Sequence, residues 1–192
     1  GFCSGMDLKA FSRGEDIGPM LEFVSNGAAK PLIGAIEGFA MAGGLELALS
    51  CDLLVAAEGA KLGIPEVKVG LFAAGSGLFR LPSRVGYSRA MEMAITGDPI
   101  TAEQAAEAGL VSMVTAKGGA LDAAIELAER IARNAPLAVA ASKAIVRATQ
   151  GATEDELRAI QQPHMKVVWG SNDAKEGPRA FADKRSPEWT GS

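Results

Sequence analysis

The chain has 192 residues, 48% of them hydrophobic, which is enough for one domain, or a large part of one, with a substantial core. Glu46, Asp52 and Glu58 interrupt its longest apolar stretch, which excludes a membrane-spanning helix, and a net charge of −4 with a pI near 5.1 argues against a general nucleic-acid surface. Its two cysteines, Cys3 and Cys51, form no scaffold and lack metal-ligand spacing, so we expect reduced thiols in a cytoplasmic protein without a metal site.

The first thirty residues are predicted to contain a loop, a helix start and a helix. The chain begins at Gly1 without methionine, directly in the segment GFCSGMDLK, and we expect the natural N-terminus to precede it. Gly5 is typical of a turn and Asp7 of a helix cap. Apolar residues at helical spacing predict a helix over residues 19–29.

A pair of glycines after an apolar segment is the most informative local pattern. Residues 31–40 (PLIGAIEGFA) are apolar enough to form one buried strand, and Gly43 and Gly44 then allow a sharp turn into the helix LELALS. The unpaired N–H groups and the dipole of a helix start suit an anion, or an oxygen that develops negative charge. Glu46 lies in the first helical turn, where we expect its ionised form to be favoured. The glycine spacing fits neither a dinucleotide-binding motif nor a P-loop.

Strands and short helices are predicted to alternate after this turn, as in an α/β domain. Residues 52–57 form a second buried strand, and residues 88–95 form a short helix. A capping box at residues 101–104 opens another helix, and residues 110–114 form a short strand. The glycine-rich residues 70–77 are predicted to be irregular.

The remainder of the chain is predicted to be helical. An apolar stripe beginning at Leu121 indicates one helix, and Pro136 starts the next. A capping box at residues 153–156 opens a helix that runs toward Trp169, and a short helix and a tail follow. We expect these helices to pack on the α/β core or on a partner subunit.

Five segments in a fixed order carry a resemblance to a known family. They are FCSGMDLK, PLIGAIEGFAMAGGLELALSCDLLVAAEGAKLGIPEVKVGL, RLPSRVG, ITGDPITAEQAAEAGLV and EGPRAFADKR. Over essentially its whole length the chain resembles the crotonase (enoyl-CoA hydratase) superfamily. The resemblance implies an α/β fold with a crotonase-type ββα spiral over residues 1–115, whose opening turns are missing from this chain. It also implies a helical region over residues 116–192 for oligomerisation and coenzyme A (CoA) contact, an acyl-CoA thioester as ligand, and a homotrimer or homohexamer.

The resemblance assigns roles to the residues of the glycine turn. In this family two backbone N–H groups hold the thioester oxygen, and these positions match Met6 and Gly43. Removing one preorganised donor to such a developing oxyanion typically costs about 10²–10³ in rate. The two glutamates that hold and activate water in the family's hydratases match Glu46 and Glu66. We interpret Glu46 as the base that takes a proton from water and Glu66 as the acid that protonates the α-carbon.

Other matches suggest contacts with CoA. Asp7 and Lys9 fall in the loop that contacts the nucleotide end of CoA in relatives, and Phe181 and Lys184 match tail positions that reach CoA on a neighbouring subunit. Both lysines are equally well read as solvated surface charges. His164, the single histidine, is interpreted as a structural or surface residue. We expect no metal and no separate cofactor, since CoA is part of the substrate.

The resemblance implies reversible syn hydration of a trans-2-enoyl-CoA. Ala42, Glu37 and residues 72–75 depart from the commonest family pattern, and the last of these leaves the acyl group open. Isomerisation of an enoyl-CoA, or the reaction of carnitinyl-CoA dehydratase, which the tail and RLP segment also resemble, remains an alternative. A non-catalytic acyl-CoA-binding protein would not need both Glu46 and Glu66. An RNA-binding protein would need a basic face that this acidic composition does not offer.

Overall fold

The computed structural model describes residues 1–7, 9, 13–14, 16 and 18–192, and the chain divides into two compact units. The first comprises Gly1–Ala28 and Leu32–Glu126, and the second comprises Ala29–Pro31 and Leu127–Ser192. The two units therefore divide within helix α7 (Ala120–Ala132). The functional division between residues 115 and 116 stays a prediction. The helix predicted to follow Asp7 falls largely on residues outside those described.

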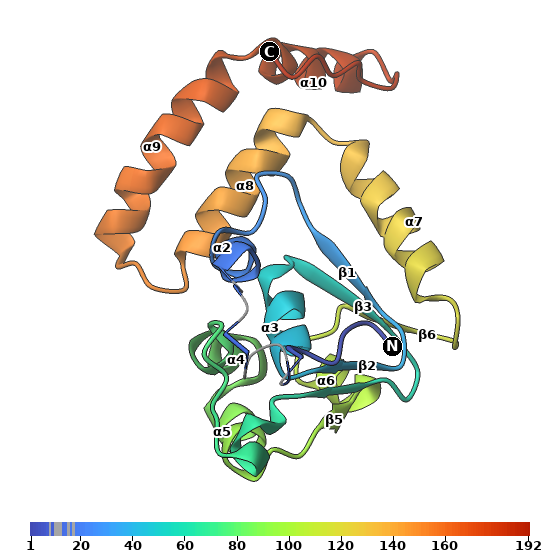
Figure 1. Ribbon diagram of the computed structural model, residues 1–192. Coiled ribbons are helices and arrows are strands. Elements are labelled where there is room, and N and C mark those ends of the chain that lie inside the picture. The colour runs from blue at the N-terminus through green and yellow to red at the C-terminus, as the bar shows by residue number, and fades with distance from the viewer. Residues whose placement is uncertain (8, 10–12, 15, 17) are drawn as a thin grey trace. The chain divides into compact units, whose positions relative to one another are not determined.

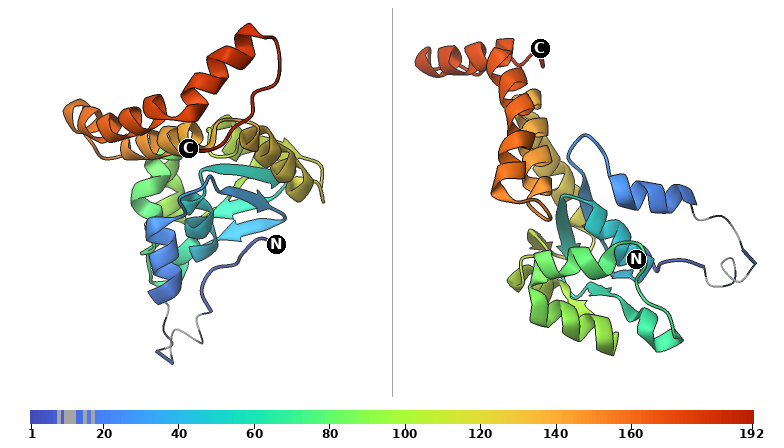
Figure 2. Two further views of the ribbon diagram at one scale, coloured as in Figure 1. Left: turned by 90° about the horizontal axis from the view of Figure 1, so that it is seen from above. Right: turned by 90° about the vertical axis from the view of Figure 1, so that its left-hand side faces the viewer.

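The strands of the first unit form two three-stranded sheets within the described residues (Figures 1 and 2). One sheet is parallel throughout, in the order β1 (Ile33–Ile36), β3 (Leu53–Ala57) and β6 (Met113–Thr115). The other has the order β2 (Phe39–Met41), β4 (Lys61–Gly63) and β5 (Ile100–Thr101), with β2 parallel and β5 antiparallel to β4. The first four strands thus alternate between the sheets, β5 pairs with β4, and the chain returns to the first sheet at β6. The predicted α/β fold is confirmed.

The prediction of a single strand over residues 31–40 is wrong, because Glu37 and Gly38 interrupt it and its two halves join different sheets. Gly38 has a φ of 74°, a left-handed conformation that glycine adopts without steric cost. The Glu37 carboxylate accepts hydrogen bonds from the N–H groups of Gly118 (3.2 Å) and Ala120 (3.0 Å), at the start of α7. Hydrophobicity alone does not reveal this break, since both halves are apolar.

The first unit contains five complete described α-helices and one 3₁₀ helix. They are α2 (Gly18–Asn26), α3 (Gly43–Ser50), the 3₁₀ helix η1 (Pro65–Val69), α4 (Gly77–Val85), α5 (Tyr87–Thr96) and α6 (Ala102–Glu107). The helices predicted near the positions of α2, α3, α5 and α6 are confirmed, including the capping box of α6 between Thr101 and Gln104. The sequence did not predict α4, whose start lies in a glycine-rich segment and which contains Pro82.

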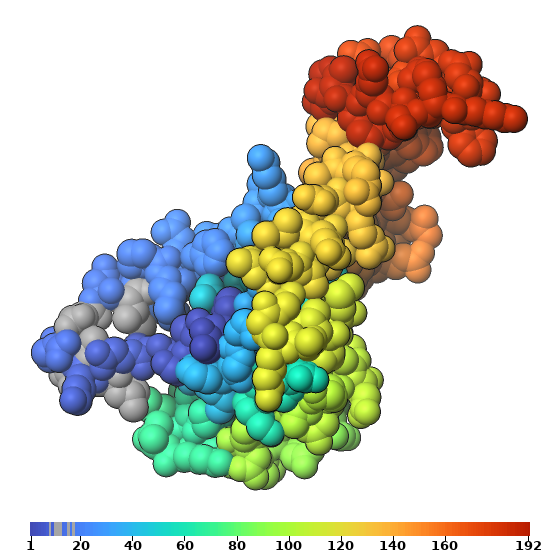
Figure 3. Space-filling view, turned by 90° about the vertical axis from the view of Figure 1, so that its right-hand side faces the viewer, coloured from blue at the N-terminus to red at the C-terminus, as the bar shows by residue number. Residues whose placement is uncertain are grey.

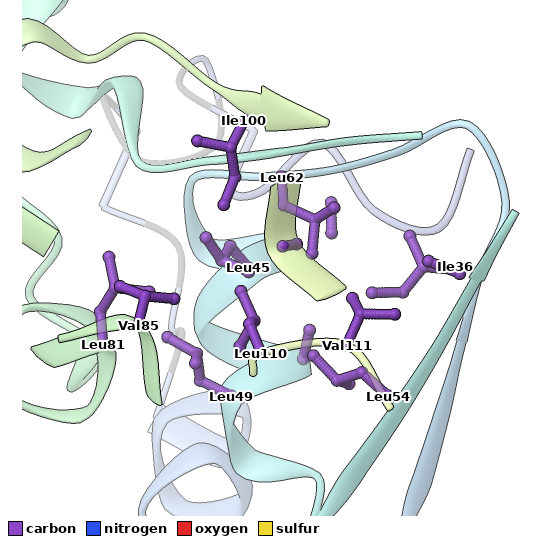
Figure 4. Close-up of a cluster of buried hydrophobic side chains, with 14 of the residues drawn as sticks. Ile36, Leu45, Leu49, Leu54, Leu62, Leu81, Val85, Ile100, Leu110 and Val111 are labelled. Carbon is purple, nitrogen blue, oxygen red and sulfur yellow. The ribbon is translucent and has the colours of Figure 1, made fainter. Parts of the chain in front are cut away.

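The core of the first unit lies between its sheets and the helices α3 and α4 (Figure 4). Its buried members include Ile36, Leu45, Leu49, Leu54, Leu62, Leu81, Val85, Ile100, Leu110 and Val111. Leu45 and Leu49 are one helical turn apart, so α3 presents one apolar face to this cluster. Burial of each such side chain contributes roughly 1.5–3 kcal/mol and fixes the helix that also carries Glu46.

The second unit is helical and contains α8 (Pro136–Ala148), α9 (Glu154–Gly170) and α10 (Asn172–Ala182). The predicted helices after Pro136 and Thr153 are confirmed, including the capping box between Thr153 and Glu156. Helices α8 and α9 pack against one another (Figure 2). In the described residues no helix is both long enough and apolar enough to cross a membrane.

The helix predicted after Leu121 is confirmed as α7, which is yellow in Figure 3. Two members of its predicted apolar stripe, Leu121 and Ile125, are 60% and 48% exposed. Exposed apolar side chains of this size are typical of surfaces that pack against a further element or subunit.

Candidate active site

Two backbone segments far apart in sequence lie together at the start of α3. The N-terminal segment runs beside β2, with the Phe2 N–H donating to the Phe39 carbonyl (2.8 Å) and the Met41 N–H donating to the Cys3 carbonyl (3.0 Å). A Cβ atom at Gly44 would overlap the carbonyl of Cys3. Gly44 is therefore required for the close approach of the two segments.

The same approach brings together the two predicted oxyanion positions, Met6 and Gly43. Gly5 has a φ of 96°, and a Cβ there would lie 3.0 Å from the Gly43 nitrogen. A Cβ at Gly43 would lie 3.7 Å from the Met6 nitrogen. The backbones of the two predicted donors are thus neighbours, although 37 positions separate them in sequence (43 minus 6).

Met6 and Gly43 line a cavity of about 330 Å³ together with Glu46 and Glu66. A second cavity of about 420 Å³ shares Glu66 and Phe72 with the first and is otherwise lined mainly by apolar residues of α4 and α5. The structure therefore gathers the predicted donors and both predicted acid–base residues around one space.

Glu46 extends from the first turn of α3 and is only 6% exposed. Its Oε1 accepts a hydrogen bond from the Gly77 N–H at 2.9 Å. Burial raises the pKa of Glu46, while the N–H groups of Gly77 and Gly75 and the charge of Arg80 act in the opposite direction. The expected preference for the ionised form therefore does not set the direction of the shift, because desolvation outweighs the effects that lower the pKa.

Glu66 lies on η1 and is partly buried. Burial raises the pKa of Glu66 and the nearby charge of Glu46 raises it further, against the effect of its own backbone N–H. Its Oε2 is buried and has no hydrogen-bond partner within the described part of the chain. A buried carboxyl oxygen without a partner at the wall of a cavity is suited to hold a water or substrate atom. Two carboxyls with raised pKa values in one cavity are typical of acid–base catalysis.

The predicted CoA-binding residues lie on the surface. Asp7 and Lys9 are exposed, and Asp7 Oδ1 accepts a hydrogen bond from the Lys9 N–H at 2.8 Å. Phe181, 87% exposed, and Lys184 belong to the second unit. The contacts of these four residues with CoA stay predictions. His164 is partly buried in a cavity between α8 and α9, away from any predicted role in chemistry.

The sequence analysis missed one part of the site, the backbone at the start of α4. Gly77 is the first residue of this helix and donates to Glu46. Gly75 also lines the catalytic cavity. The alternation of glycines around Ser76 was the available signal, but nothing local connects it to a glutamate on α3.

Comparisons with known proteins place the chain in a family. Residues 1–192 match the family described as enoyl-CoA hydratase/isomerase. The chain is 40% identical over 203 residues to the carnitinyl-CoA dehydratase of Proteus mirabilis, a match that covers 99% of this chain and 77% of that protein.

Solved structures are more similar still. An enoyl-CoA hydratase from Mycobacterium marinum is 53% identical with a TM-score of 0.95, and the match covers 99% of this chain and 77% of that one. An enoyl-CoA hydratase from Mycobacterium tuberculosis is 52% identical with a TM-score of 0.94, and the match covers 100% and 77%.

Proposed function

This chain belongs to the enoyl-CoA hydratase/isomerase family and is an enoyl-CoA hydratase-like hydro-lyase, and we propose that its reaction is the reversible syn hydration of a trans-2-enoyl-CoA to a 3-hydroxyacyl-CoA. The observation that carries the proposal is the single cavity lined by Glu46, Glu66, Met6 and Gly43. A binding protein has no need for two buried carboxyls with raised pKa values beside two adjacent backbone donors.

In this mechanism the thioester oxygen lies between the N–H groups of Met6 and Gly43, which stabilise the enolate charge as it develops. Glu46 takes a proton from water while the water oxygen bonds to the β-carbon. Glu66 donates its proton to the α-carbon. The two carboxyls exchange protonation states in each turnover, and the roles interchange in the reverse reaction. The two glutamates supply both proton transfers, so we expect no metal or redox cofactor.

Dehydration of a carnitinyl-CoA is the second candidate. The 40% identity to a carnitinyl-CoA dehydratase over 99% of this chain favours it. The same carboxyls and donors would serve the elimination of water from that substrate. The two reactions differ in the group beyond the β-carbon, which the exposed Phe72 at the junction of the two cavities would contact.

The experiment is a comparison of crotonyl-CoA, longer enoyl-CoA thioesters and crotonobetainyl-CoA with wild type, Glu46→Gln and Glu66→Gln. Each variant should lose about 10²–10⁴ in rate, the contribution of a general acid or base. Calorimetric binding of a saturated acyl-CoA should persist. Hydration near the wild-type rate in either variant would contradict the mechanism and favour a non-catalytic acyl-CoA-binding role. Double-bond migration without hydration would favour an isomerase.

We also propose that the enzyme works as a homotrimer or homohexamer. Large apolar side chains of the helical C-terminal part are exposed, among them Ile125, Trp169 (73%) and Phe181. Sedimentation should show an oligomer. Deletion of residues 177–192 should weaken assembly or CoA binding and leave the first unit folded. A fully active monomer would contradict this proposal.

A further inference from the structure

The Glu46 carboxylate is held by a helix other than its own. It projects from α3, yet the hydrogen bond to its Oε1 comes from Gly77, the first residue of α4. This bond is buried. Ser76, which precedes α4, makes no side-chain cap bond, so the carboxylate takes the place that a capping side chain would occupy.

The start of α4 leaves no room for side chains on either side of Ser76. A Cβ at Gly75 would lie 2.7 Å from Glu46 Oε2 and 3.0 Å from its Cδ. A Cβ at Gly77 would lie 3.0 Å from both the Cγ and the Oε1 of Glu46. Real Cβ atoms essentially never approach within 3.0 Å, so alanine at position 75 must displace the carboxyl group. At position 77 the contacts of 3.0 Å require the Glu46 side chain to shift by a few tenths of an ångström.

The backbone conformation at Ser76 also helps to place the N–H groups of this turn near Glu46. Ser76 has a φ of 82°, a left-handed conformation uncommon for residues other than glycine. It allows the chain to enter α4 with the Gly77 N–H bonded to the Glu46 carboxylate and the Gly75 N–H close enough to lower its pKa. Strain of this kind is retained where the surrounding structure requires the local geometry.

Two other charges face this carboxylate: Arg80 on α4, which favours its ionised form, and Glu66 on η1, whose charge opposes it. Other charged side chains on the neighbouring elements are engaged elsewhere or exposed, namely Arg84, Lys68 and Glu22. Glu66 receives only its own backbone N–H, and its Oε2 has no partner in the described residues. The two carboxyls line one cavity, but in the described residues the start of α4 donates to Glu46 and not to Glu66.

We propose that residues 75–77, which lead into α4, are the positioning element of the active site: the N–H groups and the empty Cβ positions of Gly75 and Gly77 hold Glu46 in place as the base and leave Glu66 as the proton donor. The assignment of base and acid rests on the proposed hydration. The support of Glu46 by α4 does not, because it is a property of the folded protein without substrate. Gly75 and Gly77 are positioning residues in this scheme and act through Glu46.

The test compares Gly75→Ala and Gly77→Ala with Ser76→Gly as the matched control. Displacing a reacting group by about 1 Å can cost 10²-fold in rate, so each alanine variant should lower kcat by about 10–10²-fold. KM should change little in Gly77→Ala, because Gly77 is not among the residues that line the cavity with the thioester donors. Ser76→Gly keeps both N–H groups, adds no atom, and should retain the wild-type kcat. Circular dichroism and thermal unfolding identify any variant that fails to fold.

A second measurement needs no substrate. Nuclear magnetic resonance of ¹³C-labelled glutamate carboxyls, assigned with Glu46→Gln, follows the titration of Glu46 directly. Moving the carboxylate away from two N–H donors destabilises its charged form, so the pKa of Glu46 should rise in both alanine variants and stay unchanged in Ser76→Gly.

The kinetic and the titration measurements together distinguish the proposed role of α4 from the proposed hydration. A rise in the pKa of Glu46 in an enzyme that hydrates no enoyl-CoA would support the role of α4 and overturn the proposed function. Wild-type kcat and an unchanged titration in both folded alanine variants would overturn the role of α4 and leave hydration intact. An equal fall in kcat in Ser76→Gly would also overturn it, since that variant retains both donors.

Discussion

The starts of α3 and α4 are built alike and are used differently. Each helix begins at a glycine, each is preceded by a residue with positive φ (Ala42, 53°; Ser76, 82°), and neither preceding residue provides a side-chain cap. At α4 the first N–H is bonded to Glu46. At α3 the first residue, Gly43, instead lines the cavity.

The comparison shows that the N–H groups of a helix start can have two different roles. A helix start offers N–H groups and a favourable dipole, and the protein can give them to its own carboxylate or keep them for a substrate. What decides between the two uses is the chain that faces each helix start. The α4 start faces Glu46 of a neighbouring helix, whereas the α3 start faces the backbone near Met6 across a cavity.

The largest expected effect comes from removing the donor of α3. Gly43→Pro deletes one N–H at the first helical position, and the rate should fall by about 10²–10³ or more. Met6→Ala keeps its backbone N–H and should be tolerated. Steady-state kinetics with crotonyl-CoA measures both. A ligand-bound structure should place the two N–H groups about 3 Å from one oxygen, and N–H groups that point apart would refute the assignment.

At the start of α3, Gly44 is needed for packing, whereas Gly43 is proposed to act on the substrate. Gly44→Ala overlaps the Cys3 carbonyl and should lower the free energy of unfolding by roughly 1–3 kcal/mol, as overpacking does. Gly43→Ala finds no atom closer than 3.6 Å and should keep its stability while its methyl group enters the cavity and impairs binding. Urea denaturation distinguishes them. Equal stability of the two variants would contradict the role given to Gly44.

Substitution by glycine should change the free energy of unfolding to different extents at the residues that precede α3 and α4. Ala42, with φ 53° and ψ −131°, lies outside the left-handed helical region, whereas Ser76, with φ 82° and ψ 2°, lies near it. Ala42→Gly should relieve strain and raise the free energy of unfolding by about 1 kcal/mol, net of the entropy cost of glycine. Ser76→Gly should gain less. Thermal unfolding of both variants gives the comparison, and a larger gain at Ser76 would contradict it.

The smallest expected effect is on the pH dependence of stability, and it concerns Glu66. Because burial raises the pKa of Glu66, its protonated form stabilises the fold below the ordinary pKa of 4.5, and this contribution is lost as the pH rises through the raised value. Glu66→Gln removes the titration, so its stability relative to wild type should be greater near pH 8 than near pH 5. Urea denaturation at both pH values tests this. An equal difference at both would show that Glu66 is not desolvated in solution.

Much of the fold could be predicted because its signals are local. The capping boxes at Thr101 and Thr153 and the glycine turn at Gly43 mark helix starts through bonds between residues that are close in sequence. The family motif supplied Met6, Gly43, Glu46 and Glu66 as a set, and one cavity contains all four. The break at Gly38 escaped prediction because the pairing partners of β1 and β2 lie in later strands.

By itself the sequence predicted most of the helix starts, the glycine turn and, through the family motif, the four residues that line one cavity. Only the tertiary structure decided the environment of the two carboxyls. The pKa direction of Glu46 and the unpartnered Oε2 of Glu66 depend on residues of α3, η1 and α4, and Arg80, which acts on Glu46, lies 34 positions after it (80 minus 46). A carboxyl group is desolvated when surrounding atoms exclude water from it, so desolvation occurs only when these segments pack together.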